Sequence, residues 1–333
     1  MKRKSYSLYL FLFLFLCPFI GLSATYYSRV SGNWNTASTW STASCGGVAS
    51  ATIPGAADNV IICSGNTITM NGNPANCLSL NISGTATWTS AFTTNVGSGG
   101  LTLNGGSSLT SSVAGALNVS GSLLQVSGTS TVGGISLNVT GTTTISGTLT
   151  FNNTGGTKTF TNIVINSGAN YSSTVAETYT VSGNLTMNGG TLTGTSAGIM
   201  NVAGMFIIPS GASATIGNIV LTISGLTSLS GALNDNSTGG SNTFTNLDLN
   251  ATGSFDNTSA ETYTITGNVN TYGGDFLATG ATPTFNIGGN FNVVSGICDV
   301  SRIKFTVSGT TTISGQLDIN SIVRLQTNLN FHS

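Results

Sequence analysis

Asp235 and Asp256 are the first candidates for chemistry in this 333-residue chain. They stack on neighbouring turns if each turn of the fold takes about 21 residues, and carboxylate and carbonyl oxygens are the ligands that Ca²⁺ takes in proteins. The corresponding positions in an earlier copy of the same sequence pattern hold Phe151 and Ser172, however, so the pair is not repeated. We therefore favour the interpretation that both carboxylates point to solvent, and we keep calcium as the one cofactor to test.

Other catalytic patterns are absent from the sequence. The only histidine is His332, one residue from the end, which excludes a Ser–His–Asp or Cys–His site. No CxxC pair, histidine cluster, P-loop or dinucleotide-binding loop is present. A polysaccharide lyase or hydrolase on a β-helix, which would combine clustered carboxylates with a Lys or Arg base, stays as the alternative function. We expect no catalytic residues and no enzymatic activity.

Two further groups of charged residues stand out. The segment AETYT occurs twice, with Glu177 and Glu261 at the same place in each copy, and we expect both glutamates to be exposed. Arg302, Lys304 and Arg324 make a small basic face. Such charges are typical of positions that discourage association between strands.

These residues belong to a sequence that repeats itself with a period of about 84 residues, and a fixed period indicates a stacked architecture in which neighbouring units bury a shared core. The segments VTGTTTISG, ISGLTSLSG and VSGTTTISG begin at Val139, Ile223 and Val307. We call the unit that each of them opens the large repeat. The unit from residue 307 is incomplete, so we expect a longer natural product or self-association through the C-terminal edge.

A shorter period of about 21 residues divides the large repeat. Motifs of the form V/I-x-G mostly recur after one or two of these shorter periods and end at Gly141, Gly183, Gly204, Gly225, Gly267 and Gly309. Apolar residues between them take every second place, as Phe305 and Val307 do, which predicts short strands with one buried face. The sequence therefore predicts an all-β, right-handed parallel β-solenoid with about 21 residues per coil. A row of β-sandwich domains leaves the shorter period unexplained.

The chain divides into three parts. Residues 1–24 combine a basic start, an apolar stretch and small residues, as a signal peptide does. That stretch is shorter than the ~20 residues of a membrane span. Residues 25–58 include Trp34 and Trp40, which we expect to cap the open end of the solenoid rather than to stack on sugars. Residues 59–333 form the repeats.

Composition and cysteine count narrow the partners. Charged residues are 5% of the chain, against roughly 25% in ordinary domains, which argues against binding to nucleic acids or to anionic membranes. One disulfide is expected among Cys45, Cys63 and Cys77, in any of three pairings. Cys298 lies some ten coils away at ~4.8 Å per coil, beyond the reach of a disulfide, so it is expected to be unpaired and buried.

Threonine is abundant, so we looked for a flat threonine array. The triplets that follow the V/I-x-G glycines read TTT, NLT, MFI, LTS, NVN and TTT. This is too irregular for a continuous threonine ladder.

The N-terminal segment carries a resemblance. Its turns at Gly32-Asn33-Trp34 and Ser38-Thr39-Trp40, followed by Ile53-Pro54-Gly55 and Asp58-Asn59-Val60-Ile61-Ile62, lie within one short stretch after the predicted signal peptide. They resemble the start of secreted repeat proteins from bacteria with type IX secretion, and the eight-glycine domain at the start of some extracellular β-helices. The resemblance implies an exported or cell-surface protein, often an adhesin, and no defined catalytic residues. The C-terminal sorting domain usual in such proteins is not visible here.

Together these observations predict a secreted, structural or adhesin-like solenoid on the bacterial surface. We expect it to contact polysaccharides or surface glycans through a face rich in Thr, Ser and Asn.

Overall fold

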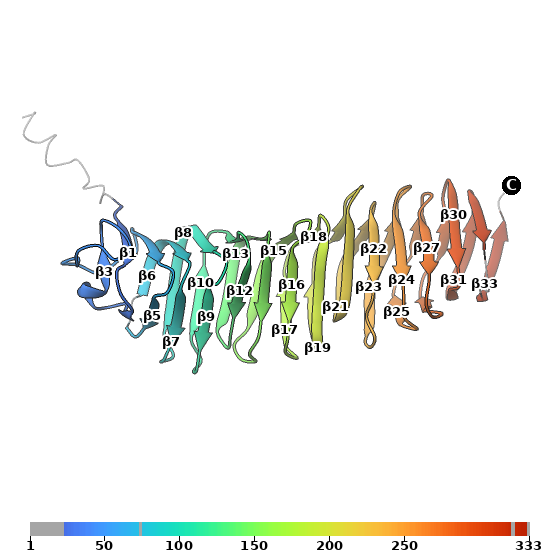
Figure 1. Ribbon diagram of the computed structural model, residues 1–333. Coiled ribbons are helices and arrows are strands. Elements are labelled where there is room, and N and C mark those ends of the chain that lie inside the picture. Colours follow the sequence, from blue (N-terminus) through green and yellow to red (C-terminus); the bar gives the residue numbers. More distant parts are fainter. Residues whose placement is uncertain (1–22, 73–74, 321–323, 332–333) are drawn as a thin grey trace, which may run out of the picture.

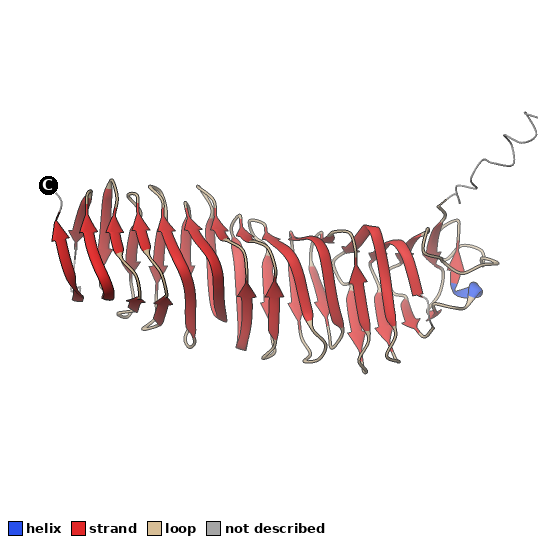
Figure 2. Cartoon of the chain, turned by 180° about the vertical axis from the view of Figure 1, so that it is seen from behind, coloured by secondary structure: helices blue, strands red, loops and turns tan. Residues whose placement is uncertain are grey.

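The computed structural model describes residues 23–72, 75–320 and 324–331. Most of the predicted signal peptide (1–24) and His332 lie outside these residues. The described chain is a parallel β-solenoid whose coils are stacked in sequence order, as the colours of Figure 1 show. Seen from behind in Figure 2, it consists of strands joined by turns and loops, with one short 3-10 helix, η1 (Ala37–Thr39), near the N-terminal end. The predicted all-β solenoid is therefore confirmed, and a row of β-sandwiches is excluded.

Each coil contributes strands to three columns, which we call A, B and C in chain order. Strands confined to column A are β10 (Ala116–Val119), β17 (Thr178–Val181), β25 (Thr262–Ile265) and β28 (Thr284–Ile287). Strands confined to column B are β1 (Thr25–Ser28), β4 (Asn59–Ile62), β11 (Leu123–Gln125), β18 (Leu185–Met187), β20 (Phe206–Ile208), β26 (Val269–Thr271) and β29 (Phe291–Val293).

Column C holds the largest set of separate strands. They are β2 (Gly32–Asn33), β5 (Thr67–Met70), β7 (Thr85–Trp88), β9 (Ser108–Ser111), β12 (Thr129–Val132), β14 (Thr148–Phe151), β16 (Asn170–Ser173), β22 (Ala232–Asp235), β24 (Ser254–Asn257), β27 (Asp275–Ala278), β30 (Ile297–Ser301) and β32 (Gln316–Ile319).

Longer strands pass from one column to the next. From A to B run β6 (Ala75–Ile82), β8 (Thr93–Leu103), β13 (Ser136–Ile145), β15 (Lys158–Ile165), β23 (Ser241–Leu249), β31 (Lys304–Ile313) and β33 (Arg324–Phe331). Strand β19 (Gly190–Val202) runs from C to A, and β21 (Ser213–Leu229) runs through all three columns.

The register between coils explains the repeated glycine motif. From β4 onward, the number of residues between register partners is close to the predicted period. It is smallest for Thr67 with Thr85 and largest for Gly190 with Ala214. The V/I-x-G glycines stand at the corner between columns A and B, where consecutive coils approach closely. A Cβ atom on Gly225, for example, would clash with the Gly204 carbonyl oxygen. Only glycine fits such a corner.

Alternating side chains from all three columns fill the interior. Two aromatic clusters stand one large repeat apart, because the repeat copies the core as well as the turns. Phe160, Tyr171 and Tyr179 recur as Phe244, Phe255 and Tyr263, and all six side chains are buried. The second cluster continues into the following coils through Phe276, Phe285, Phe291 and Phe305, with neighbouring ring centroids 5.1 to 6.3 Å apart.

Residues 25–58 lie at the N-terminal end of the solenoid (Figure 1). Strand β1 adds in parallel to β4 and pairs in antiparallel with β3 (Trp40–Ser41). The rings of Trp34 and Trp40 pack edge to face, with centroids 5.1 Å apart, and both are buried, so neither ring is free to stack on a sugar. A disulfide joins Cys45 to Cys63, while Cys298 is free and buried as predicted.

We predict that Phe255→Ala lowers the free energy of unfolding by about 3–5 kcal/mol, because this buried ring contacts four other aromatic rings and its removal leaves a cavity. Thr178→Ala, on the exposed side of β17, should change stability by less than about 0.5 kcal/mol. Thermal unfolding followed by circular dichroism measures both. Equal melting temperatures for the two variants would contradict the assigned core.

Candidate functional site

The structure separates the two aspartates that were expected to stack. Asp256 pairs in register with Asn234, whereas Asp235 pairs with Asn257. Successive residues of a strand point to opposite faces, so Asp235 faces the core and is fully buried, while Asp256 lies on the outer face. The proposed ladder of Asp235 on Asp256 is therefore not formed, and the expectation that both carboxylates point to solvent is wrong for Asp235. In the described part of the chain, no three His, Cys, Asp or Glu side chains gather as a metal-binding group.

A buried ion pair marks the same region of the preceding large repeat. The ammonium group of Lys158 lies 2.9 Å from Oε1 of Glu177 and donates to the carbonyl oxygens of Gly155 (2.8 Å) and Gly156 (3.4 Å). Burial lowers the pKa of Lys158, and the hydrogen bond and charge of Glu177 oppose that shift. The expectation that Glu177 is exposed is wrong, because the turn before β17 folds it inward onto the neighbouring coil.

The next large repeat keeps the glutamate and changes its surroundings. Asn242 stands where Lys158 stood, and Asp235 stands where Phe151 stood. Asp235 accepts hydrogen bonds from the backbone N–H of Ser237 (2.9 Å), the Asn242 amide (3.0 Å) and the Tyr263 hydroxyl (3.0 Å). Three donors around a buried carboxylate offset much of the cost of burying its charge.

Glu261 is the unsatisfied member of this second group. The residue is 5% exposed, and neither carboxylate oxygen has a hydrogen-bond partner of normal geometry. Burial raises the pKa of Glu261 to about 7; the charge of Asp235 adds to the rise, and the nearby backbone N–H of Gly239 opposes it. The prediction that this glutamate is exposed is therefore also wrong.

Acidic side chains also follow one another on the outer face of column C towards the C-terminal end. Asp299 pairs in register with Asp318, and the Asp299 backbone N–H donates to the Asp275 carboxylate (3.0 Å). Burial raises the pKa of Asp275, the Asp299 N–H opposes this, and the Asp299 charge adds to it. The basic residues lie elsewhere: Lys304 pairs with Arg324 in column A, next to the turn that holds Arg302.

The outer face of column C changes character towards the N-terminal end, where it forms an uncharged hydroxyl ladder. Eight successive strands each present two outward polar residues separated by one buried position. We call this set the Thr ladder; its pairs are Thr67 and Thr69, Thr85 and Thr87, Ser108 and Thr110, Thr129 and Thr131, Thr148 and Thr150, Asn170 and Ser172, Thr191 and Thr193, and Ser213 and Thr215. The pairs are in register from β5 to β9 and from β12 to β19. The register slips by two residues at the other two steps, so that Thr131 faces Ser108 and Thr215 faces Thr191. Register partners lie ~4.8 Å apart along the solenoid, and the two members of a pair about 6.7 Å apart along the strand.

The threonine array was missed because it was sought on the wrong strands. The irregular triplets after the V/I-x-G glycines belong to column B. The regular pairs follow the next glycine along the chain, where Gly65, Gly106 and Gly168 turn the chain into column C with positive φ. Reading the residues after that second glycine reveals the T-x-T pattern.

Side-chain hydrogen bonds between coils occur both in the Thr ladder and in the outer row of column A. That row is Asn or Thr at twelve register-paired positions from Asn76 to Thr306. Its amides bond to one another, as Asn95 and Asn118 do at 3.0 and 3.1 Å to the preceding asparagine. In the Thr ladder, the Thr131 hydroxyl donates to Ser108 (2.8 Å), and the Thr191 and Thr193 hydroxyls donate to Asn170 (2.7 and 3.1 Å). Among the described residues, the hydroxyl groups of Thr87, Thr148 and Thr150 make no side-chain hydrogen bond and can bond to water or to a ligand.

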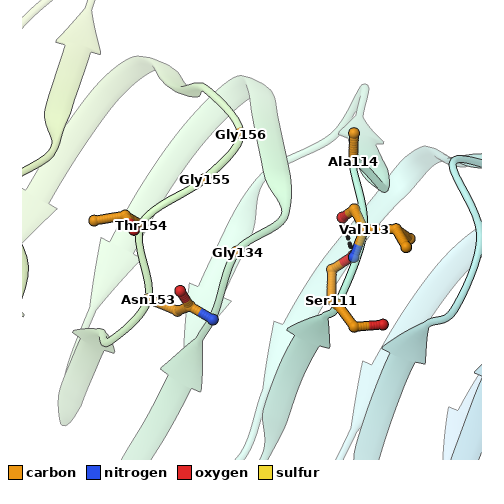
Figure 3. Close-up of a pocket in the computed structure, with 9 residues that line it drawn as sticks. Ser111, Val113, Ala114, Gly134, Asn153, Thr154, Gly155 and Gly156 are labelled. Carbon is orange, nitrogen blue, oxygen red and sulfur yellow. Dashed lines mark hydrogen bonds between the residues drawn. The ribbon is translucent and has the colours of Figure 1, made fainter.

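A shallow pocket of about 330 Å³ adjoins the Thr ladder at the corner between columns C and A. Figure 3 shows Ser111, Val113 and Ala114 on one side, Asn153 and Thr154 on the other, and Gly134 between them. The turn at Gly134 is shorter than its neighbours, which leaves a notch. All the lining residues are uncharged.

Comparison with known proteins found no match among protein families, curated proteins or solved structures. In the part of the chain that the structure covers, no helix is long and apolar enough to cross a membrane. We therefore infer the function from the surface of the solenoid.

We predict that stability falls as the pH rises from about 5 to about 8, through ionisation of Glu261. A carboxyl group whose pKa is raised from 4.5 to about 7 stabilises the fold most below pH 4.5, and this contribution is lost as the pH passes 7. The loss amounts to at most about 3 kcal/mol. Glu261→Gln, which cannot ionise, should lack this component.

The measurement is chemical denaturation of both proteins across this pH range in buffer that contains a chelator. A stability difference between them that does not change with pH would contradict the assignment.

Proposed function

We propose that the chain is an exported, non-catalytic β-solenoid that attaches to repetitive, uncharged surfaces, chiefly polysaccharides, through the Thr ladder. The observation that supports this best is the succession of eight strands that each carry two uncharged polar residues on one face, four of them (β12, β14, β16 and β19) in unbroken register. Along the strands that are in register, a polymer with a regular repeat meets similar polar groups at each step. Many weak contacts then act together, because each additional contact is made within one complex.

The chemistry of the Thr ladder suits polyhydroxylated ligands. Each threonine offers a hydroxyl group that donates and accepts, next to a methyl group. A single hydrogen bond exchanged with water contributes only about 1 kcal/mol, so binding on this face has to come from the number of contacts. The notch beside Gly134 adds polar groups from Ser111 and Asn153 to the edge of the same surface.

Export is supported by the sequence and by the disulfide. Residues 1–24 have the pattern of a signal peptide. The Cys45–Cys63 bridge agrees with an oxidising compartment. The resemblance of the N-terminal segment to secreted repeat proteins supports type IX secretion and a place on the outer cell surface. A structural or adhesive role follows from that location together with the Thr ladder.

Arginine substitutions on three faces test which surface binds. Thr150→Arg places a long charged side chain in the middle of the Thr ladder, between its register partners Thr131 and Ser172. Thr186→Arg makes the same change on the outer face of column B, and Thr180→Arg makes it on column A. We predict that Thr150→Arg weakens binding by about tenfold or more, because it blocks contact along several coils, and that the two controls bind as the unchanged protein does.

The measurements are a glycan array and co-sedimentation with insoluble polysaccharides, together with a cleavage assay on the same polymers. No binding by the unchanged protein, or equal binding by all three variants, would refute the proposal. Loss of binding in Thr180→Arg alone would assign the contact to column A. Cleavage of a bound polymer would favour the enzyme alternative.

A further inference from the structure

Corresponding turns in the two copies of the large repeat differ in whether they hold a cationic side chain. In the first copy, the Lys158 ammonium group lies between the carbonyl oxygens of Gly155 and Gly156 and the Glu177 carboxylate. In the second copy, the glycine pair and the glutamate recur as Gly239, Gly240 and Glu261. The lysine does not recur, because Asn242 takes its position. The first copy therefore shows what this turn accommodates: a positive charge held by oxygen atoms.

Asn242 does not substitute for the missing ammonium group. Its amide nitrogen donates to Asp235 (3.0 Å), and its amide oxygen accepts from the Leu221 backbone N–H (2.8 Å). Both groups of the amide are used within the core, and neither contacts the glutamate. Glu261, a residue that is 5% exposed, has no hydrogen-bond partner of normal geometry at either carboxylate oxygen.

The charges of the two copies do not match. Lys158 and Glu177 cancel one another, and theirs is the one ion pair among the described residues. In the second copy, Asp235 and Glu261 are both carboxyl groups, and only neutral donors surround Asp235. When both are ionised, the turn carries two buried negative charges. Buried charges without a counter-charge are expensive, so a cation that reaches this turn gains a large electrostatic attraction.

We propose that this turn binds one Ca²⁺ ion in the place where the first copy holds the lysine ammonium group. Glu261 is the charged ligand, and Asp235 supplies the second negative charge from behind. The pocket beside them, of about 430 Å³, is lined by Thr238, Gly239, Gly240 and residues 259–262 and is open to water, so water molecules can complete the shell. An irregular set of oxygen ligands suits Ca²⁺ better than Mg²⁺, which demands a near-ideal octahedron.

The glycine pair allows the change that binding requires. Gly155 and Gly156 have φ values of 131° and 68° in the first copy, whereas in the second only Gly240 has a positive φ, of 128°. The two turns therefore differ in conformation although both contain the glycine pair. Glycine reaches both conformations at little cost. Binding would turn a carbonyl oxygen of Gly239 or Gly240 towards the ion, as in the first copy.

The test is calcium titration of chelator-treated protein, by calorimetry and by the shift in melting temperature at constant ionic strength. The unchanged protein should bind one Ca²⁺ per chain and melt at a higher temperature when it is bound. Asn242→Lys restores the ammonium group of the first copy and should weaken calcium binding by about tenfold or more, because the two cations compete for one place. Glu261→Gln should do the same, and it keeps the test decisive if the lysine variant fails to fold.

Asp299→Asn is the matched control, because it removes a carboxylate from the outer face of column C and leaves the turn intact. It should bind Ca²⁺ as the unchanged protein does. The proposal is overturned if the unchanged protein shows no calcium-dependent shift, if Glu261→Gln binds normally, or if Asp299→Asn alone loses binding. A stronger effect of Mg²⁺ than of Ca²⁺ would also overturn it.

Discussion

The parallel hydrogen-bond ladder between successive coils is the constraint on which the rest of the structure depends. It places each paired strand residue opposite a partner on the next coil, so residue types that recur in register form rows along the solenoid. Inward rows form the core, and outward rows form surfaces such as the Thr ladder. The ladder also sets how closely the corners approach, which is why Gly204 and Gly225 admit no side chain. Core, corners and candidate surface therefore share one geometric cause.

The same stacking brings charged residues together in the interior. A turn that projects Glu177 inward places it against Lys158 of the preceding coil, although 19 residues separate them in sequence. In the second copy, the lysine is gone, a second carboxylate is present, and donors from neighbouring strands surround it. Removing one member of a buried ion pair usually destabilises a fold strongly. In the second copy, Asp235 has hydrogen-bond donors around it, whereas neither oxygen of Glu261 has a partner of normal geometry.

Period, fold class and the free state of Cys298 were predictable, because each follows from spacing along the chain. The face of the sheet on which each aspartate lies could also have been predicted from the alternation of buried residues. Asp235 is in phase with buried Leu233, and Asp256 directly follows buried Phe255, so alternation alone puts them on opposite faces. The burial of the two glutamates was not predictable in this way, since it depends on how neighbouring turns pack. The same holds for the Cys45–Cys63 pairing, which depends on the path of the N-terminal segment.

Disulfide cross-linking between engineered cysteines tests the coil register most directly. Thr150 and Ser172 are register partners on adjacent coils, within disulfide reach at ~4.8 Å between strands. Thr150 and Asn170 belong to the same two strands but are offset by two residues, about 7–8 Å apart. The account predicts that, under mild oxidation, Thr150→Cys/Ser172→Cys forms an intramolecular bridge readily and Thr150→Cys/Asn170→Cys does not. Preferential bridging of the offset pair, or of neither pair in a folded protein, would contradict the register and with it the Thr ladder.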